Sequence, residues 1–503
     1  MLKERMTIYD IFRDKCFSNS KKEFIVYKEK RYTYGEFFYY TNCLVKKLVN
    51  IRVKRGDKIG VFSQNRPEFL MLYFALSRLG AILIPINIHL NNNEILSILK
   101  QTQTSVLIVS NNISSENYLA VFESYRNYLP FLKQIIDMDT FCSKNTKLYE
   151  DVDISINLPN YLDPFVIIFT SGSTGKAKGV VLNHYNVITN AIAVVNRLEF
   201  KEDDVFLFAP PLFSMFGIGG TMMALLGGSK IVLMDHYNVR TALDLIEKEK
   251  VTIHSGNWTM FTAELNDPAL GCYNLGSLRL GMIGGTVISK DLIKDVKEKM
   301  GLYLCNVYGM TEAAGGVTLV RPHANRKVWL TTVGYPLEGT EIKIISENGH
   351  ELHCGETGEL ICRGVHFADY YLGDKGLYPV KKNGWFYTGD LGFFDSDGCI
   401  KILGRKKDLI KKGVYNIFTS ELERVINTNP LVVDSSVVAI DKSVYAFVVN
   451  KPNAKIKPED IISFCNQKNK RYYQVIDKVI IVPELPLTGT GKVDKIKLSQ
   501  IYL

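Results

Sequence analysis

A loop rich in glycine and hydroxyl groups, placed directly after an apolar segment, constrains this chain more than any other stretch. Residues 169–179 read Phe-Thr-Ser-Gly-Ser-Thr-Gly-Lys-Ala-Lys-Gly, and residues 165–168 before them read Phe-Val-Ile-Ile. The apolar, β-branched run predicts a buried strand. Backbone N–H groups, hydroxyls and ammonium groups can together surround several phosphate oxygens. The sequence therefore predicts a strand that ends in a polyphosphate-binding loop.

This loop differs from the loop of the P-loop nucleotide hydrolases. Their motif requires Ser or Thr directly after a Gly-Lys pair, and a second glycine upstream of that pair. Here Ala177 follows Gly175 and Lys176, so the hydroxyl that would bind magnesium is missing. Thr170 occupies the position of the upstream glycine. The two departures exclude the P-loop interpretation.

The pattern of elements changes along the chain. A charged turn at 54–58 leads into an apolar strand at 59–62, Pro67 opens an apolar helix, and residues 80–87 predict another buried strand. This order is typical of an α/β sheet. From Gly358 onward, short strands with turn signals predict a β-rich lobe, followed by a basic stretch and a compact mixture of helix and strand.

Composition narrows the class of protein. Hydrophobic residues make up 46% and charged residues 22% of the 503 residues, which is typical of a globular protein. The most apolar stretch, residues 218–234, contains four glycines and Lys230, and no apolar run reaches the ~20 residues of a membrane span. The start of the chain lacks the apolar core of a signal peptide. Nine scattered cysteines form no Cys-x-x-Cys pair, so we expect a reduced cytoplasmic protein without integral membrane contact.

The net charge of +9 is spread along the chain. Such a charge suits anionic partners, including nucleotides, CoA or an acidic carrier protein. No basic run alternates with aromatic residues as a nucleic-acid stacking surface requires. We therefore expect no nucleic-acid partner.

Residues 169–179 resemble, nearly letter for letter, the phosphate loop of the acyl-adenylating superfamily. This superfamily contains acyl- and aryl-CoA synthetases, peptide-synthetase adenylation domains and luciferases. Ala177 replaces the usual proline without removing a ligand. The resemblance covers essentially the whole chain and implies an α/β fold. It implies a large N-terminal domain of layered α/β sheets with a β-rich lobe at 1–403, a hinge at 404–407, and a small mobile α+β C-terminal domain at 408–503.

Further motifs of the superfamily supply the implied nucleotide site. Tyr308 would lie against the adenine, Thr311 would donate to the α-phosphate, and Glu312 would hold Mg²⁺, a hard cation that takes oxygen ligands. Asp390, in Tyr-Thr-Gly-Asp, would accept both ribose hydroxyls. The implied ATP- and AMP-binding residues are Thr170, Ser171, Gly172, Ser173, Thr174, Gly175, Lys178, Gly284, Gly285, Thr286, Asn306, Tyr308, Gly309, Asp390 and Arg405.

Two motifs near the C-terminus are implied to move. The stretch Gly-Arg-Lys-Lys-Asp-Leu-Ile at 404–410 resembles the hinge between the two domains, with Arg405 on the ribose or phosphate and the pivot at Lys407. The glycine-rich stretch 486–492 resembles the terminal motif and ends at the implied catalytic Lys492. An ammonium on such a loop can reach both a carboxylate and the α-phosphate. The implied catalytic residues are Lys492, Thr311 and Glu312.

The resemblance also implies an acyl pocket, although two positions depart from the usual pattern. Ser214 replaces a histidine that often gates the pocket, and Trp258 would narrow it toward a small or flat acid unless it is plain core. Asn257 would bond a polar group of the substrate, and the lack of an aspartate nearby disfavours amino acids. The implied pocket residues are Phe213, Ser214, Asn257, Trp258, Gly309, Met310 and Ala313.

The sequence leaves the thiol acceptor open. The family usually has a Gly-Gly pair after the hinge, whose second glycine lies beside the pantetheine path in CoA ligases, and here the pair reads Gly413-Val414. The branched side chain of Val414 requires either a shifted path for CoA or the arm of a carrier protein. Both acceptors carry the same phosphopantetheine thiol.

We therefore expect an AMP-forming ligase that joins a carboxylic acid to a thiol. A carboxylate attacks the α-phosphorus of ATP to give acyl-AMP and pyrophosphate, and the acyl group then passes to a pantetheine thiol, with CoA the first choice. The first alternative is a stand-alone adenylating enzyme that loads a carrier protein. The second is a nucleotide-binding regulator without catalysis.

Two other clusters favour structural interpretations. Residues 350–354, His-Glu-Leu-His-Cys, lie among turn residues and predict a surface hairpin rather than a metal site. The Gly-Gly pairs at 219–220 and 227–228 flank an apolar stretch and are typical of helix packing.

Overall fold

The predicted strand before the glycine-rich loop is β7 (Pro164–Ser171), which pairs antiparallel with β8 (Ala177–Asn183). The computed structural model describes residues 5–111, 113–143, 158–171, 177–285, 288–412, 415–440, 443–452, 454–468, 475–487 and 493–503. These residues form two compact units. The first contains Met1–Gly284, Lys290–Glu341 and Arg363–Phe386, and the second contains Gly285–Ser289, Ile342–Cys362 and Tyr387–Leu503.

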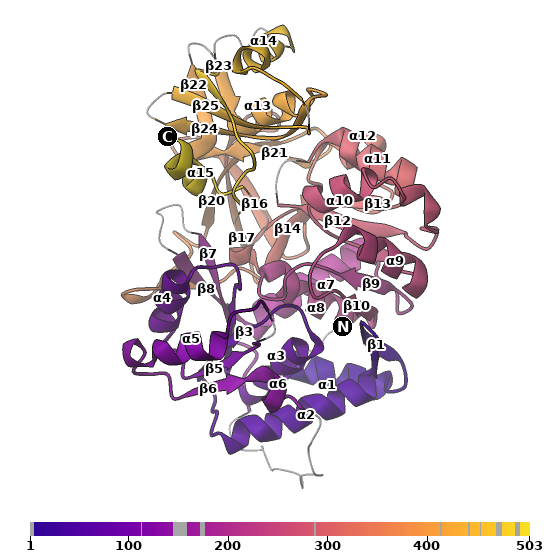
Figure 1. Ribbon diagram of the computed structural model, residues 1–503, viewed down its shortest axis with the longest axis vertical. Helices are drawn as coiled ribbons and strands as arrows, with labels where there is room; N and C mark the ends of the chain where they lie inside the picture. Colours follow the sequence, from indigo (N-terminus) through magenta and orange to yellow (C-terminus); the bar gives the residue numbers. More distant parts are fainter. Residues whose placement is uncertain are drawn as a thin grey trace. The chain divides into compact units, whose positions relative to one another are not determined.

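The β7–β8 hairpin belongs to one of the two large sheets of the first unit (Figure 1). Among the described residues this sheet has eight strands in the order β19-β18-β8-β7-β4-β3-β5-β6. The other strands are β3 (Lys58–Phe62), β4 (Ile82–Ile86), β5 (Val106–Val109), β6 (Gln134–Asp137), β18 (Tyr370–Gly373) and β19 (Gly376–Pro379). The strands β3 and β4 run parallel and are joined by α3 (Pro67–Leu79), which confirms the strand–helix–strand order expected at 59–87.

The second large sheet has nine strands among the described residues, in the order β15-β14-β13-β12-β11-β9-β10-β1-β2. Their bounds are β1 (Glu23–Tyr27), β2 (Lys30–Thr33), β9 (Val205–Phe208), β10 (Lys230–Leu233), β11 (Ile253–His254), β12 (Leu280–Gly284), β13 (Tyr303–Met310), β14 (Gly315–Leu319) and β15 (Tyr335–Pro336). Most central strands are parallel and consist of buried apolar residues, which is typical of a sheet covered on both faces.

Helices of the first unit cover these sheets (Figure 1). Several begin with a capping box, in which the side chains of the cap and of a residue three positions later bond each other's backbone N–H, as with Asn91 and Glu94. Besides α3, the helices and 3₁₀ turns are α1 (Ile8–Ser18), α2 (Tyr34–Asn50), α4 (Asn92–Thr102), α5 (Tyr118–Ser124), η1 (Arg126–Tyr128), α6 (Met138–Phe141), α7 (His184–Leu198), α8 (Met215–Gly227), α9 (Val239–Glu249), α10 (Trp258–Leu265), η2 (Leu270–Cys272), α11 (Lys290–Met300), η3 (Thr311–Ala313) and α12 (Arg326–Thr331).

The second unit is smaller and rich in strands. Its elements are β16 (Thr340–Ile345), β17 (Gly358–Gly364), β20 (Phe386–Phe394), β21 (Ile400–Arg405), η4 (Lys406–Asp408), β22 (Leu409–Lys412), β23 (Tyr415–Phe418), α13 (Thr419–Ile426), β24 (Val432–Ile440), β25 (Ser443–Asn450), α14 (Pro458–Lys468), β26 (Lys478–Ile481) and α15 (Lys495–Tyr502). Apolar side chains such as Ile417, Leu422 and Val437 form its core.

The α/β fold class, with a large N-terminal part and a smaller C-terminal part, is confirmed. The hairpin expected near 350–354 is also present, because Ile345 and Glu351 form an antiparallel bridge around a tight turn. The apolar stretch between the Gly-Gly pairs is the helix α8, as expected. The boundary at residue 403 and the hinge at 404–407 stay predictions. No helix formed by the described residues is long and apolar enough to cross a lipid bilayer.

Candidate active site

Four segments that the sequence assigns to substrate binding follow neighbouring strands of the nine-stranded sheet. The strands β13, β12, β11 and β9 lie side by side in this order and run parallel. The segments 309–312 and 255–258 follow β13 and β11, Gly284 ends β12, and 209–217 follows β9. Since parallel strands end at the same edge of a sheet, these segments meet there, where ligands of open α/β sheets bind.

Two glycines of the implied nucleotide site are required by close contacts between backbones. A Cβ atom on Gly309 would lie 2.3 Å from the carbonyl oxygen of Gly315, and one on Gly284 would lie 2.4 Å from that of Val307. Any larger residue would push neighbouring strands apart. The glycines are therefore needed to build the edge of the sheet, independently of any contact with adenine.

The other residues of the implied adenine and magnesium motif end β13 and form η3. Tyr308, Thr311 and Glu312 are half-buried, whereas Asn306 is buried and its amide donates to the carbonyl of Thr332 at 3.2 Å. This hydrogen bond ties β13 to the C-cap residue of α12. The turn η3 is the element that presents Thr311 and Glu312 beyond the end of the strand.

The phosphate-loop hairpin is connected to Glu312 through the strands β8 and β18. Thr170 pairs with Lys178 across the hairpin, and Tyr371 of β18 pairs with Val180 of β8. The ammonium nitrogen of Lys178 lies 5.5 Å from the centre of the Tyr371 ring, a cation–π distance. Residues 172–176, which join the two strands in the sequence, lie outside the described residues.

Tyr371 connects this hairpin to Glu312. Its hydroxyl donates to Oε1 of Glu312 at 2.7 Å, and the N–H of Ala368 donates to the carbonyl oxygen of Glu312 at 2.8 Å. Burial, followed by the charge of Glu312, raises the pKa of Tyr371, so its hydroxyl stays protonated at neutral pH. The sequence analysis missed Tyr371, because nothing in residues 369–373 distinguishes it from an ordinary strand tyrosine.

The helix α7 bonds the turn that directly follows Glu312. The buried amide of Asn190 donates to the carbonyls of Ala313 at 3.1 Å and Gly316 at 2.6 Å, and its oxygen accepts from the N–H of Gly316. One turn earlier, Asn186 donates to the carbonyls of Val365 and Phe367. These asparagines were also missed, although their spacing of four residues directly after β8 places them on one face of the helix.

The two polar residues of the implied acyl pocket cap helices. Ser214 is the N-cap of α8, accepting from the N–H of Gly217 and donating to the carbonyl of Pro211 at 2.7 Å. Asn257 is the N-cap of α10, where its oxygen accepts from the N–H of Met260. Both oxygens are thus already used in starting helices. Among the apolar pocket residues, Phe213 and Ala313 are buried and Trp258 and Met310 are half-buried.

Three polar residues, Tyr237, His254 and Glu264, are joined by hydrogen bonds next to the helix α10. Nε2 of His254 lies 2.8 Å from Oε1 of Glu264, and the hydroxyl of Tyr237 donates to the same oxygen at 2.8 Å. His254 and Glu264 are completely buried. His254 belongs to β11 and Glu264 to α10. Separating the two elements would leave a buried carboxylate without a partner, which is costly, so the triad holds β11 and α10 together.

In the second unit, the implied ribose residue and the hinge arginine face each other. Asp390 of β20 is opposite Arg405 of β21, with Nε of Arg405 2.9 Å from Oδ1 of Asp390. Asp390 is buried, and its N–H donates to the hydroxyl of Thr388. Lys407, the implied pivot, is exposed.

Several implied residues lie outside the described residues, so their roles stay predictions. They are Gly172, Ser173, Thr174, Gly175, Thr286, Gly413, Val414 and Lys492. For Ser171 only the backbone is described. The roles assigned to the described site residues likewise stay predictions.

The residues around Glu312 fit a magnesium ion that is shared with a nucleotide. The described residues gather no group of three or more His, Cys, Asp or Glu side chains that could enclose a metal. Magnesium commonly binds one or two carboxylates and completes its shell with phosphate oxygens and waters. A single carboxylate at the edge of the sheet suits that mode.

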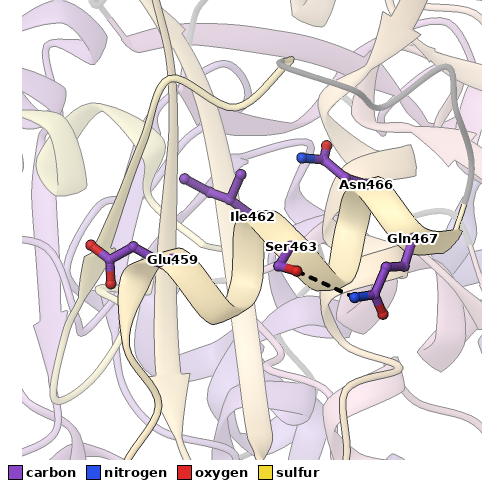
Figure 2. A pocket seen from close by; sticks show the side chains of 5 residues that line it. All are labelled: Glu459, Ile462, Ser463, Asn466 and Gln467. Atoms are coloured by element: carbon purple, nitrogen blue, oxygen red, sulfur yellow. Dashed lines mark hydrogen bonds between the residues drawn. The ribbon is translucent and has the colours of Figure 1, made fainter.

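A hollow elsewhere in the second unit involves none of these residues. It has a volume of about 470 Å³ and runs along one face of α14 (Figure 2). Its lining residues are Glu459, Ile462, Ser463, Asn466 and Gln467, and the amide of Gln467 donates to Ser463 within the helix. All five lining residues belong to one helix, whereas a ligand site is a concave cleft that surrounds most of the ligand. This hollow is therefore not a candidate ligand site.

Known proteins share this architecture over nearly the whole chain. A putative acyl-CoA synthetase, YngI, of Bacillus subtilis (strain 168) is 30% identical over 95% of this chain and 94% of its own length. The medium-chain fatty-acid–CoA ligase of Escherichia coli (strain K12) is 27% identical over 93% of this chain and 85% of its own length. The crystal structure of the anthranilate CoA ligase AuaEII with anthranoyl-AMP has a TM-score of 0.88 and 25% identity, covering 99% of this chain and 98% of that one.

Family profiles agree with these relatives. Residues 12–372 match the family described as AMP-binding enzyme, and residues 421–492 match the AMP-binding enzyme C-terminal domain. The first match alone covers more than half of the chain, so the resemblance inferred from the motifs is confirmed. This chain is a member of the AMP-binding enzyme family.

Proposed function

We propose that the protein is an AMP-forming acid–thiol ligase of the acyl-CoA synthetase type. It would convert a carboxylic acid and ATP into acyl-AMP and pyrophosphate, and then transfer the acyl group to the thiol of CoA with release of AMP. The meeting of four implied substrate segments at the carboxyl ends of β9, β11, β12 and β13 carries this proposal.

The first half-reaction must bring two anions together. At an effective dielectric constant near 20, one pair of unit charges 4 Å apart interacts by about 4 kcal/mol, so a few cationic groups offset the repulsion between carboxylate and triphosphate. Lys178 on β8 and Arg405 on β21 are cations on implied nucleotide segments. Mg²⁺ held by Glu312 would neutralise phosphate charge. Lys492 would place an ammonium between the carboxylate and the α-phosphate.

The two half-reactions need different catalytic groups, and rotation at the proposed hinge would bring each group to the substrate in turn. Rotation of residues 408–503 about Lys407 would withdraw Lys492 after adenylation and bring Gly413 and Val414 toward the thiol. Such domain movements often limit turnover. Val414, in place of the second glycine, keeps a carrier-protein phosphopantetheine as the alternative acceptor.

One experiment tests the first half-reaction and another tests the acceptor. ATP–pyrophosphate exchange should appear with at least one acid of a panel that includes medium-chain fatty acids and anthranilate, the acids named for the relatives. No exchange with any acid, combined with tight ATP binding, would favour the nucleotide-binding regulator. Thioester formation should then proceed with CoA, whereas acylation of carrier proteins alone would favour the first alternative.

A further inference from the structure

Tyr371 contacts two oppositely charged side chains at once. Its hydroxyl donates to Oε1 of Glu312 at 2.7 Å, and its ring lies 5.5 Å from the ammonium nitrogen of Lys178. Glu312 is the implied magnesium ligand, and Lys178 belongs to the implied phosphate loop. Tyr371 therefore contacts both the Lys178 ammonium and the Glu312 carboxylate, two groups that would bind the same Mg²⁺-bound triphosphate.

The backbone fixes all three residues relative to one another. Lys178 and Val180 lie on β8, and the adjacent strand β18 pairs Tyr371 with Val180. The N–H of Ala368, three residues before Tyr371, donates to the carbonyl oxygen of Glu312 at 2.8 Å. The main chains that carry Tyr371 and Glu312 are thus held next to each other by backbone hydrogen bonds.

A tyrosine at this position solves an electrostatic problem. A carboxylate and an ammonium that meet directly form an ion pair, and each then loses sites for other ligands. The phenol ring keeps Lys178 beside its face, where the ammonium retains its N–H donors. The hydroxyl occupies one oxygen of Glu312 without neutralising the charge, so the other oxygen remains for a metal.

We propose that Tyr371 is a positioning residue that orients Glu312 for Mg²⁺ and separates Glu312 from Lys178. This inference rests on the proposed function, because it assigns Glu312 and Lys178 to the same bound Mg·ATP. It adds a residue that no motif in the sequence identified.

Calorimetric titration of ATP, without any acid, tests the role of the hydroxyl. Tyr371→Phe should weaken the binding of ATP about tenfold in the presence of Mg²⁺, which corresponds to about 1.4 kcal/mol. The same variant should bind ATP normally in EDTA. It should also need more Mg²⁺ for half-maximal pyrophosphate exchange, while thioester formation from supplied acyl-AMP stays unchanged. Tyr370→Phe, which removes the neighbouring exposed hydroxyl, is the matched control.

Tyr371→Leu tests the separation of charges. We expect that loss of the ring lets Lys178 pair with Glu312, so this variant should lose affinity for ATP in EDTA as well as in Mg²⁺. Unchanged Mg·ATP affinity in Tyr371→Phe, or an equal loss with and without Mg²⁺, would overturn the orienting role. Equal behaviour of the Phe and Leu variants would overturn the separating role. A wild-type protein that binds no ATP would instead overturn the proposed function, and thermal unfolding shows whether each variant is folded.

Discussion

Arg405 and Asp390 form an ion pair across β20 and β21, with Nε of Arg405 2.9 Å from Oδ1 of Asp390. The carboxylate side chain is 7% exposed, whereas the arginine side chain is 54% exposed. Arg405 also donates to the carbonyl of Thr388 at 3.2 Å. The arginine therefore holds the implied ribose acceptor from the solvent side.

Asp390→Asn should remove the preference for a ribose 2′-hydroxyl. A carboxylate can accept both hydroxyls of the ribose, whereas an amide has only one acceptor oxygen. We expect the wild type to bind ATP more tightly than 2′-deoxy-ATP by about tenfold, in line with about 1.5 kcal/mol for a hydrogen bond to a charged group. The variant should bind both nucleotides equally in calorimetric titrations. A ratio unchanged by the substitution would show that Asp390 does not contact the 2′-hydroxyl.

Lys492→Ala should separate the two half-reactions. Loss of one preorganised donor to the developing charge typically raises a barrier by about 2.7–4 kcal/mol, so pyrophosphate exchange should fall about 10²–10³-fold. Thioester formation from supplied acyl-AMP should continue, because that step does not need the lysine. Lys497→Ala, an exposed lysine on α15, is the control. An equal loss in both half-reactions would refute the assigned division of roles.

Asn190→Leu should slow the adenylation half-reaction. Its amide holds both carbonyls of the turn after Glu312, and a displacement of about 1 Å at a reacting group can cost about 10²-fold in rate. We expect kcat/KM for pyrophosphate exchange to fall by about 10- to 100-fold, as measured under matched Mg²⁺. Asn196→Leu, on the same helix beyond this contact, serves as control. Wild-type exchange in the Asn190 variant would show that the turn holds its shape alone.

Glu264→Ala should destabilise the first unit strongly. The substitution leaves His254 and Tyr237 buried without their shared partner, and breaking a buried pair in this way typically costs about 3–5 kcal/mol. Urea unfolding followed by tryptophan fluorescence measures the loss, since Trp258 begins the same helix. Tyr237→Phe should cost less, about 1–2 kcal/mol, because it removes the hydroxyl that bonds Glu264 and the carbonyl of Met260 but leaves His254 paired with Glu264. A Glu264→Ala variant as stable as wild type would exclude the anchoring role.

Stability should fall as pH decreases from 6.5 to 4. Burial lowers the pKa of His184 and of His366 to about 4, so in this window the unfolded chain binds protons that the folded protein does not. Each histidine should contribute about 1.4 kcal/mol per pH unit to the free energy of unfolding, a stability that is fully present above pH 6.5. His184→Phe should reduce the slope in denaturant titrations between pH 6 and 5. His350→Gln, at an exposed site, should leave the slope unchanged.

The sequence by itself determined the features that are local along the chain. The apolar run 165–168 forms a buried strand, Pro67 opens a helix, and the motif that contains Glu312 lies at the end of β13. Each of these features depends only on residues close together in the sequence, because hydrophobic periodicity, turn residues and contiguous motifs extend over a few positions. The family and the fold class follow from them.

Only the tertiary structure decided which distant side chains meet. Tyr371 and Glu312 are 59 positions apart, and Asn190 and Gly316 are 126 apart. Such contacts arise from the register of β18 on β8 and from the packing of α7 against β14, which no local pattern encodes. The structure also showed that Ser214 and Asn257 cap helices through N–H groups three residues further on, a local role that resemblance to a pocket motif does not distinguish from substrate binding. Local chemistry therefore selects the family, whereas long-range packing sets how its charged groups are held.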